Sequence, residues 1–103
     1  MDILTRGFYT TGVIGLTKGD ANAYASFNIR INAISPGYVE TPLIKAGMDM
    51  AKDSPLHADL ARTPLGRMAS MEEIADAIVW LSSPMNSYAQ GSTLVVDGGF
   101  TTN

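Results

Sequence analysis

The chain has 103 residues, of which 46% are hydrophobic and 17% charged, so we expect a globular chain with at most one domain. A formal net charge of −3 repels phosphate groups and disfavours nucleic acid or an anionic membrane as a partner. Cysteine is absent, which excludes disulfides, thiolate nucleophiles and cysteine metal sites. The sequence shows no signal peptide and no apolar run of about 20 residues, so a soluble cytoplasmic protein is expected.

The first predicted element is a helix over residues 11–27, which follows Tyr9 in the stretch GFYTTGVIGL. Its apolar residues, among them Val13, Leu16 and Ala21, recur at roughly helical spacing. Three glycines in the same stretch each cost the helix about 1 kcal/mol relative to alanine. The sequence therefore predicts a weak helix.

A strand is predicted next, over residues 28–34 (NIRINAI), because its side chains alternate between two faces. Two prolines and a glycine in SPGYVETP then predict a loop over residues 35–42. Residues 43–67 have a loose pattern, which predicts short helical turns in a mobile segment.

The clearest predicted element is the helix in SMEEIADAIVWLSSP. Ser70 and Glu73 have the spacing of a capping box, and Pro84 ends the helix. Its apolar face comprises Ile74, Ala77, Ile78 and Leu81. A short apolar strand, Thr93 to Val96, follows and ends at Asp97 and two glycines.

This order of elements predicts an α/β fold. A strand, a crossover helix and a second strand form a right-handed unit with parallel strands. Parallel strands normally have both faces covered by helices, which two strands alone cannot arrange. The sequence therefore predicts part of a doubly wound parallel sheet.

Four stretches, in this order, resemble the C-terminal part of a classical short-chain dehydrogenase/reductase: VIGLTK, IRINAISPGYVETPL, PLGRMASMEEIADAIVWLSSP and GSTLVVDGG. The resemblance covers about residues 9–100. It implies that residues 1–103 form the C-terminal part of a Rossmann-type domain, its last two strands with their helices, with the coenzyme-binding N-terminal half absent. It also implies NAD or NADP as cofactor, and hydride transfer between the nicotinamide and a small-molecule carbonyl or alcohol.

The resemblance makes Tyr9 the counterpart of the family's catalytic tyrosine. The family places a lysine four residues later, where it lowers the pKa of the tyrosine and holds the nicotinamide ribose. Val13 stands at that place here, and Lys18 is about two and a half helical turns beyond Tyr9. The family's coenzyme glycine motif and its serine are also missing. We therefore expect Tyr9 to be inert; a packing aromatic at the start of a helix is the alternative.

The resemblance also implies cofactor-binding positions after the first strand. Pro36 and Gly37 match the turn that faces the nicotinamide. Val39 matches a position whose backbone meets the carboxamide, and Thr41 one whose hydroxyl reaches the cofactor. A purely structural interpretation has the proline and glycine forming a turn and Thr41 capping a helix that starts at Pro42; both roles can hold together.

Residues 43–62 match the family's substrate loop, whose methionines suit an apolar, adaptable pocket. The alternative is an exposed loop whose methionines shield the core. His57 in this segment has no metal-ligand partner in the sequence pattern, so no metal site is expected.

The sequence leaves three interpretations of the chain open. The first is an NAD(P)-dependent oxidoreductase by family that is inactive as this truncated chain. The second is a non-catalytic dimerisation or interaction module, and the third is a truncated gene product. Because the first strand would be open on one side, the chain is expected to be marginal or aggregating as a monomer, unless it forms a homo-oligomer or pairs with a full-length relative.

Overall fold

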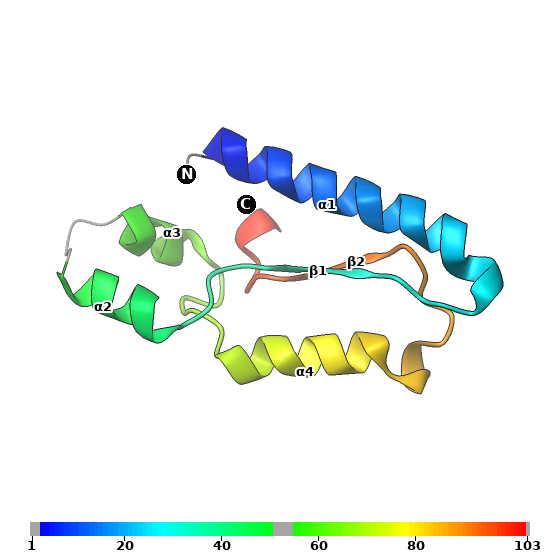
Figure 1. Ribbon diagram of the computed structural model, residues 1–103. Helices are drawn as coiled ribbons and strands as arrows, with labels where there is room; N and C mark the ends of the chain where they lie inside the picture. Colours follow the sequence, from blue (N-terminus) through cyan, green and yellow to red (C-terminus); the bar gives the residue numbers. More distant parts are fainter. Residues whose placement is uncertain (1–2, 51–54, 103) are drawn as a thin grey trace. The chain divides into compact units, whose positions relative to one another are not determined.

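The computed structural model describes residues 3–50 and 55–102, with the side chains of residues 12–47 and 55–102. Four α-helices and two strands follow one another in these ranges (Figure 1): α1 (Ile3–Tyr24), β1 (Ala33–Pro36), α2 (Pro42–Met50), α3 (Pro55–Arg62), α4 (Met71–Ser82) and β2 (Thr93–Val96). Short 3-10 turns occupy Ala25–Phe27, Pro84–Asn86 and Phe100–Thr102. Among these helices none has the length and hydropathy of a membrane-crossing segment.

The chain divides into two compact units. Unit 1 consists of residues 1–35 and 78–94, and unit 2 of residues 36–77 and 95–103. The boundary passes through β1, α4 and β2. Unit 1 therefore holds α1 and the beginnings of both strands, whereas unit 2 holds α2, α3 and the loops that follow the strands.

The two strands form one parallel sheet. The Ala33 N–H donates to the Ser92 carbonyl at 2.9 Å, and the Gly37 N–H donates to the Val96 carbonyl at 3.0 Å. From the first bond to the second, the donor and the acceptor both lie further towards the C-terminus, as they do in parallel strands. The predicted parallel pairing of these two segments through a crossover helix is confirmed.

The first strand begins later than the sequence indicates. A strand was expected over residues 28–34, with a loop from residue 35, but β1 runs from Ala33 to Pro36. The amide side chains of Gln90 and Asn32 supply the reason. Gln90 Oε1 accepts the Ile31 N–H at 2.8 Å, and Asn32 Oδ1 accepts the Ser92 N–H at 3.0 Å. These side chains thus bind backbone N–H groups that would pair with the neighbouring strand in a regular β-ladder.

Helix α1 differs from its prediction at both ends, because it spans Ile3–Tyr24 rather than residues 11–27. Residues 25–27 form a 3-10 turn that ends at Asn28 in the left-handed conformation, with φ of 61°. An added Cβ would meet no atom within 4 Å at Gly12, Gly15 or Gly19. These glycines therefore weaken the helix without serving a close contact in the described structure.

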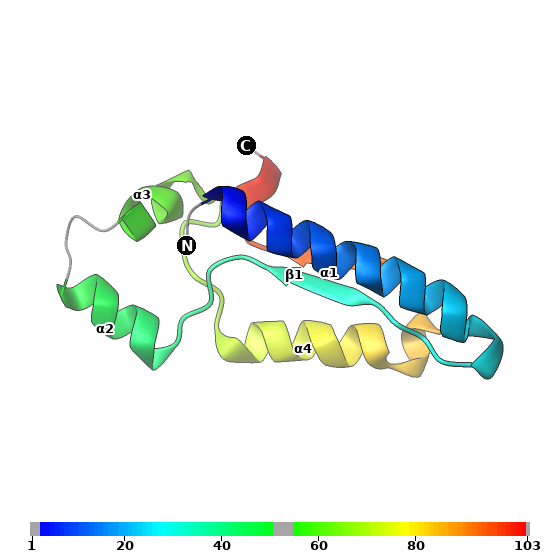
Figure 2. The ribbon, with the colours of Figure 1, turned by 45° about the horizontal axis from the view of Figure 1, so that its top comes forward.

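Unit 1 is organised around the strands. α1 and residues 78–82 of α4 lie on opposite sides of them (Figures 1 and 2). The buried apolar side chains of the described residues are Ala21 of α1, Ala33 of β1 and Leu81 of α4. The apolar face predicted for α4 therefore does reach the core, although Ile78 remains 48% exposed.

Arg30 connects the end of α4 to the segment that enters β1. Its guanidinium donates to four backbone carbonyls, those of Leu81, Ser82, Ser83 and Ala89, at 3.0–3.3 Å. The last carbonyls of a helix have no partner within the helix and carry partial negative charge. The Arg30 guanidinium therefore provides hydrogen-bond donors for the last carbonyls of α4.

The segment after β1 forms the helices expected of it. Residues 43–67 contain α3 and all of α2 except its first residue, Pro42, which agrees with the predicted short helical turns. Residues 51–54 between the two helices lie outside the described residues. Strand β2, Thr93–Val96, has the bounds predicted from the sequence. α4 begins directly after Ser70 and ends two residues before Pro84, also as predicted.

Candidate functional site

The four residues predicted to bind the cofactor all belong to unit 2. Pro36, predicted to lie in a turn, is the last residue of β1, because the strand extends beyond its expected end, and the other three follow it. Gly37 stands where two backbones meet. Its N–H donates to Val96, and an added Cβ would lie 2.9 Å from both Cα and Cβ of Asp97. Such distances are shorter than real Cβ contacts allow, so glycine is required here by close approach rather than by its φ.

Val39 is held by a parallel bridge to Ala69. The Ala69 N–H donates to the Tyr38 carbonyl at 2.9 Å, and the Glu40 N–H donates to the Ala69 carbonyl at 2.8 Å. The bridge thus uses the groups on either side of Val39. Within the part of the chain that the structure describes, the N–H and C=O of Val39 itself have no hydrogen-bond partner. This residue therefore combines a fixed backbone with an available donor and acceptor.

Thr41 caps helix α2. Its Oγ1 accepts the Ile44 N–H at 3.3 Å, and its carbonyl accepts the Lys45 N–H at 2.9 Å. Pro42 occupies the first helical position, where its missing N–H has no cost. The structural role predicted for Thr41 is confirmed, while its contact with a cofactor stays a prediction.

The turn after β2 lies against the same loop and is built on Asp97. This carboxylate accepts the Gly99 N–H at 2.9 Å, the Thr101 N–H at 3.0 Å and the Thr101 hydroxyl at 2.7 Å. The Thr101 hydroxyl, and then the backbone donors, lower the pKa of Asp97. Gly98 and Gly99 have φ of 63° and 90°, a region that other residues rarely adopt.

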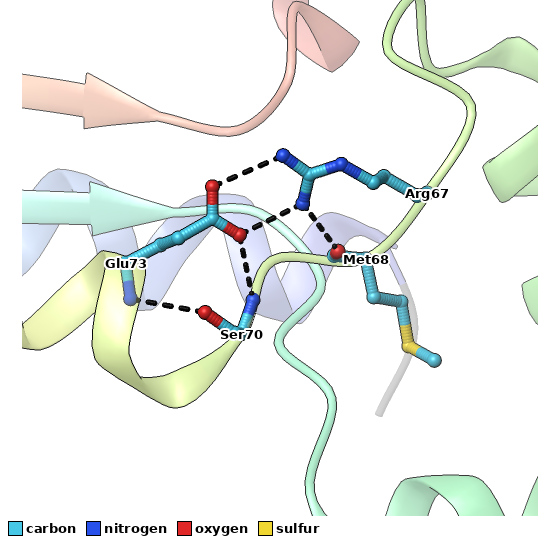
Figure 3. Close-up of polar contacts among 4 residues, drawn as sticks. All are labelled: Arg67, Met68, Ser70 and Glu73. Atoms are coloured by element: carbon cyan, nitrogen blue, oxygen red, sulfur yellow. Dashed lines mark hydrogen bonds and ion pairs between the residues drawn. The ribbon is translucent and has the colours of Figure 1, made fainter.

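A second anchor lies at the start of α4, next to Ala69 (Figure 3). Arg67 binds both carboxylate oxygens of Glu73, with Nη1–Oε1 at 2.7 Å and Nη2–Oε2 at 3.0 Å. Ser70 and Glu73 form the predicted capping box: the Ser70 N–H donates to Glu73 Oε1, and the Glu73 N–H donates to Ser70 Oγ. Arg67 also donates to the Met68 carbonyl at 3.1 Å.

The Arg67 contact changes the titration of both partners. The Arg67 hydrogen bond, followed by the Ser70 N–H, lowers the pKa of Glu73 from its ordinary value of 4.5 to about 2. The Glu73 carboxylate raises the pKa of Arg67. Both side chains are exposed, so solvent screens this pair and it contributes little to global stability. Its effect is local, on the segment that carries Ala69.

Cavities occur in both units of the described structure. The one beside the candidate loop has about 80 Å³ and is lined in part by Tyr38, Asp97 and Gly98, which is too small for a nicotinamide ring system. The other, of about 320 Å³, lies in unit 1 along Arg30 and Leu81. It contains none of the predicted site residues, and the Arg30 guanidinium that lines it is engaged by carbonyls.

Tyr9 belongs to helix α1 and to unit 1. Its side chain lies outside the described residues, so its catalytic role stays a prediction. Val13, at the place of the family's lysine, is 57% exposed on the same helix. His57 is exposed on α3, and the described residues contain no cluster of three or more histidine, aspartate or glutamate side chains that could hold a metal.

The backbone partners that position the loop were not found from the sequence. Ala69 and Asp97 are distant in sequence from Val39 and Gly37, and neither residue type signals such a contact. The glycines of DGG were a sequence signal for a turn, but not for its contact with the first loop.

The sequence matches a family model described as Enoyl-(Acyl carrier protein) reductase over residues 7–101. The chain belongs to the short-chain dehydrogenase/reductase family. It is 44% identical over 91 residues to the short-chain dehydrogenase srdC of Neurospora crassa, covering 86% of this chain and 32% of the relative. It is 42% identical over 88 residues to a 3-oxoacyl-(acyl carrier protein) reductase of Thermotoga maritima, covering 85% and 34%.

Solved structures of the family agree. L-sorbose reductase from Gluconobacter frateurii, solved with NADPH and L-sorbose, is 33% identical and superimposes with a TM-score of 0.78 over 90% of this chain and 38% of that chain. The resemblance and the fold class predicted from the sequence, part of a Rossmann-type doubly wound parallel sheet, are confirmed. The chain spans about a third of the length of the curated relatives it matches.

Proposed function

We propose that this chain forms the nicotinamide-facing part of an NAD(P)-dependent oxidoreductase acting on a small-molecule carbonyl or alcohol. Family membership supports this, as do relatives named dehydrogenase or reductase. The observation that carries the proposal is Val39, whose backbone is held in place while its own N–H and C=O have no partner among the described residues.

The chemistry of a nicotinamide carboxamide fits this residue. The carboxamide offers one carbonyl acceptor and one NH₂ donor, and Val39 offers one N–H and one C=O. Gly37 has no side chain to obstruct the approach, and Thr41 fixes the far end of the loop at the start of α2. Bound there, the cofactor would supply or accept the hydride, and this loop would orient its ring.

We further propose that the 103-residue chain alone does not turn over a substrate. A tyrosine without a neighbouring cation is a weak general acid at neutral pH, and Val13 stands where the family has its lysine. The coenzyme glycine motif, which would place a pyrophosphate at a helix N-terminus, is not found in these 103 residues. Tight binding of the whole dinucleotide is therefore not expected.

The test is a titration of the chain with reduced nicotinamide mononucleotide, followed by the backbone amide resonances. We expect weak binding, with a dissociation constant above about 100 μM, and shifts concentrated at Val39 and its neighbours. ADP-ribose, which lacks the nicotinamide, is the matched control ligand and should not change the chemical shifts of these resonances. Hydride transfer with a panel of ketones and alcohols should be absent in the wild type and in Tyr9→Phe.

Two variants separate the backbone contact from a general effect. Val39→Pro removes the free N–H but leaves both bridge hydrogen bonds, which belong to Tyr38 and Glu40, and it should abolish the response. Val39→Ala keeps the N–H and should respond like the wild type. Shifts absent from the wild-type loop, or retained in Val39→Pro, would contradict the proposed contact.

A further inference from the structure

Tyr38, between the two proposed nicotinamide-facing residues Gly37 and Val39, reaches helix α3. Its hydroxyl donates a short hydrogen bond to Oδ2 of Asp59. Both residues belong to unit 2, and both side chains are only partly exposed. A hydrogen bond to a carboxylate is among the stronger neutral-to-charged contacts in proteins.

Two further residues, Arg62 and Phe100, complete a closed set of side-chain contacts with Tyr38 and Asp59. Oδ1 of Asp59 lies 3.8 Å from Nη1 of Arg62, one turn along α3. The Arg62 guanidinium lies over the ring of Phe100, 5.3 Å from its centroid. Phe100 in turn meets Tyr38 edge to face, at 6.2 Å between centroids and 82° between planes. Each side chain thus contacts the next, which restricts the rotamers of all four.

These four side chains connect three segments that are separate in sequence. Tyr38 belongs to the candidate loop, Asp59 and Arg62 to α3, and Phe100 to the turn that follows Asp97. The Tyr38 carbonyl accepts the Ala69 N–H of the bridge that holds Val39, so the same residue contacts both the bridge and α3. Asp59 is held from its other side as well, because its carbonyl accepts the Thr63 hydroxyl at 2.9 Å.

We propose that Tyr38 and Asp59 are a positioning pair, which couples nicotinamide binding at the loop to the placement of α3. α3 forms the described C-terminal part of residues 43–62, the segment matching the family's substrate loop. A displacement of α3 would pull on Tyr38 and hence on the backbone next to Val39. This proposal rests on the proposed function, because it takes the loop as the nicotinamide-facing surface.

The test is amide hydrogen exchange of the full chain, without and with reduced nicotinamide mononucleotide. The variants are Tyr38→Phe, which removes only the hydroxyl, and Asp59→Asn, which keeps the shape but removes the charge. Matched controls are Tyr88→Phe, whose ring is fully exposed, and Asp76→Asn on the exposed side of α4. Without ligand, both variants should exchange the α3 amides about tenfold faster, with α4 unchanged, and both controls should match the wild type.

Exchange measured with the nucleotide distinguishes coupling between the loop and α3 from an effect on stability alone. In the wild type the nucleotide should slow exchange at α3 as well as at Val39; in Tyr38→Phe it should still act at Val39 but no longer at α3. Unchanged α3 exchange in both variants, or equal acceleration in α4, would overturn the pair. A wild type that ignores the nucleotide would refute the proposed function and with it the coupling, whereas the unliganded exchange still decides whether the pair holds α3.

Discussion

Each of the two units is stabilised internally by a different kind of contact. All three buried apolar residues of the described structure, Ala21, Ala33 and Leu81, belong to unit 1. In unit 2, the one buried residue among those described is polar, Thr63. Unit 1 therefore has a small apolar core, whereas unit 2 depends on hydrogen bonds and on close approach between backbones.

The polar contacts differ in the same way. In unit 1, long side chains bind backbone carbonyls: Arg30 at the end of α4, and Gln90 at Ala21 and Ile29. In unit 2, glycines allow backbones to touch, and short side chains close turns on themselves. Gly37 lies against the backbone of Asp97, and Gly99 lies against the ring of Pro64. The candidate site lies in unit 2, where the bridge between Val39 and Ala69 holds the main-chain donor and acceptor of Val39 in place.

The largest expected effect is in unit 1, at Arg30. Arg30→Ala removes four charge-assisted hydrogen bonds and exposes the end of α4, so we expect a loss of about 3 kcal/mol in the free energy of unfolding. Urea unfolding followed by circular dichroism measures it. Lys18→Ala, which removes an exposed cation from α1, is the control and should change stability by less than about 0.5 kcal/mol. Equal stabilities of the two variants would show that the carbonyl contacts are dispensable.

An intermediate effect is expected in unit 2, at Gly37. Gly37→Ala would place a methyl group 2.9 Å from Asp97, and the shift needed to relieve it should cost about 2 kcal/mol. Gly15→Ala has open space in helix α1 and should instead stabilise the chain, by up to about 1 kcal/mol. Opposite signs for the same substitution, measured by thermal unfolding, would sharpen the contrast between helix propensity and backbone contact. A neutral Gly37→Ala would mean that the two loops are not in close contact.

The smallest effect concerns the exposed Glu73 and depends on pH. Because its folded pKa is lowered from 4.5 to about 2, the stability it contributes is present above about pH 4.5 and is lost as pH falls through about 2. The stability difference between wild type and Glu73→Gln should therefore be constant near neutrality and vanish at the acid end of that window. Glu72→Gln, in the same first turn, controls for loss of negative charge at the helix start. A difference that persists at pH 2 would argue against the Arg67 contact.

Patterns that are local in sequence predicted the elements well. The capping box of Ser70 and Glu73, the bounds of β2 and the cap at Thr41 follow from side chains that act within a few residues of their own position. The start of β1 was predicted wrongly, because Gln90 and Asn32 supply hydrogen-bond partners to backbone that alternation alone assigns to a strand. Side-chain amides from distant segments leave no periodic signal.

The sequence by itself determined the family and the parallel pairing of the two strands, since both depend on residue type and order along the chain. The loop that should face a nicotinamide stays a prediction from the same sequence. Only the tertiary structure decided how that loop is held: Val39 by Ala69, Gly37 against Asp97, and Tyr38 by Asp59. These contacts join residues 20 or more positions apart, so they depend on where folding brings each backbone. Composition and periodicity report the neighbours along a chain, and not those across it.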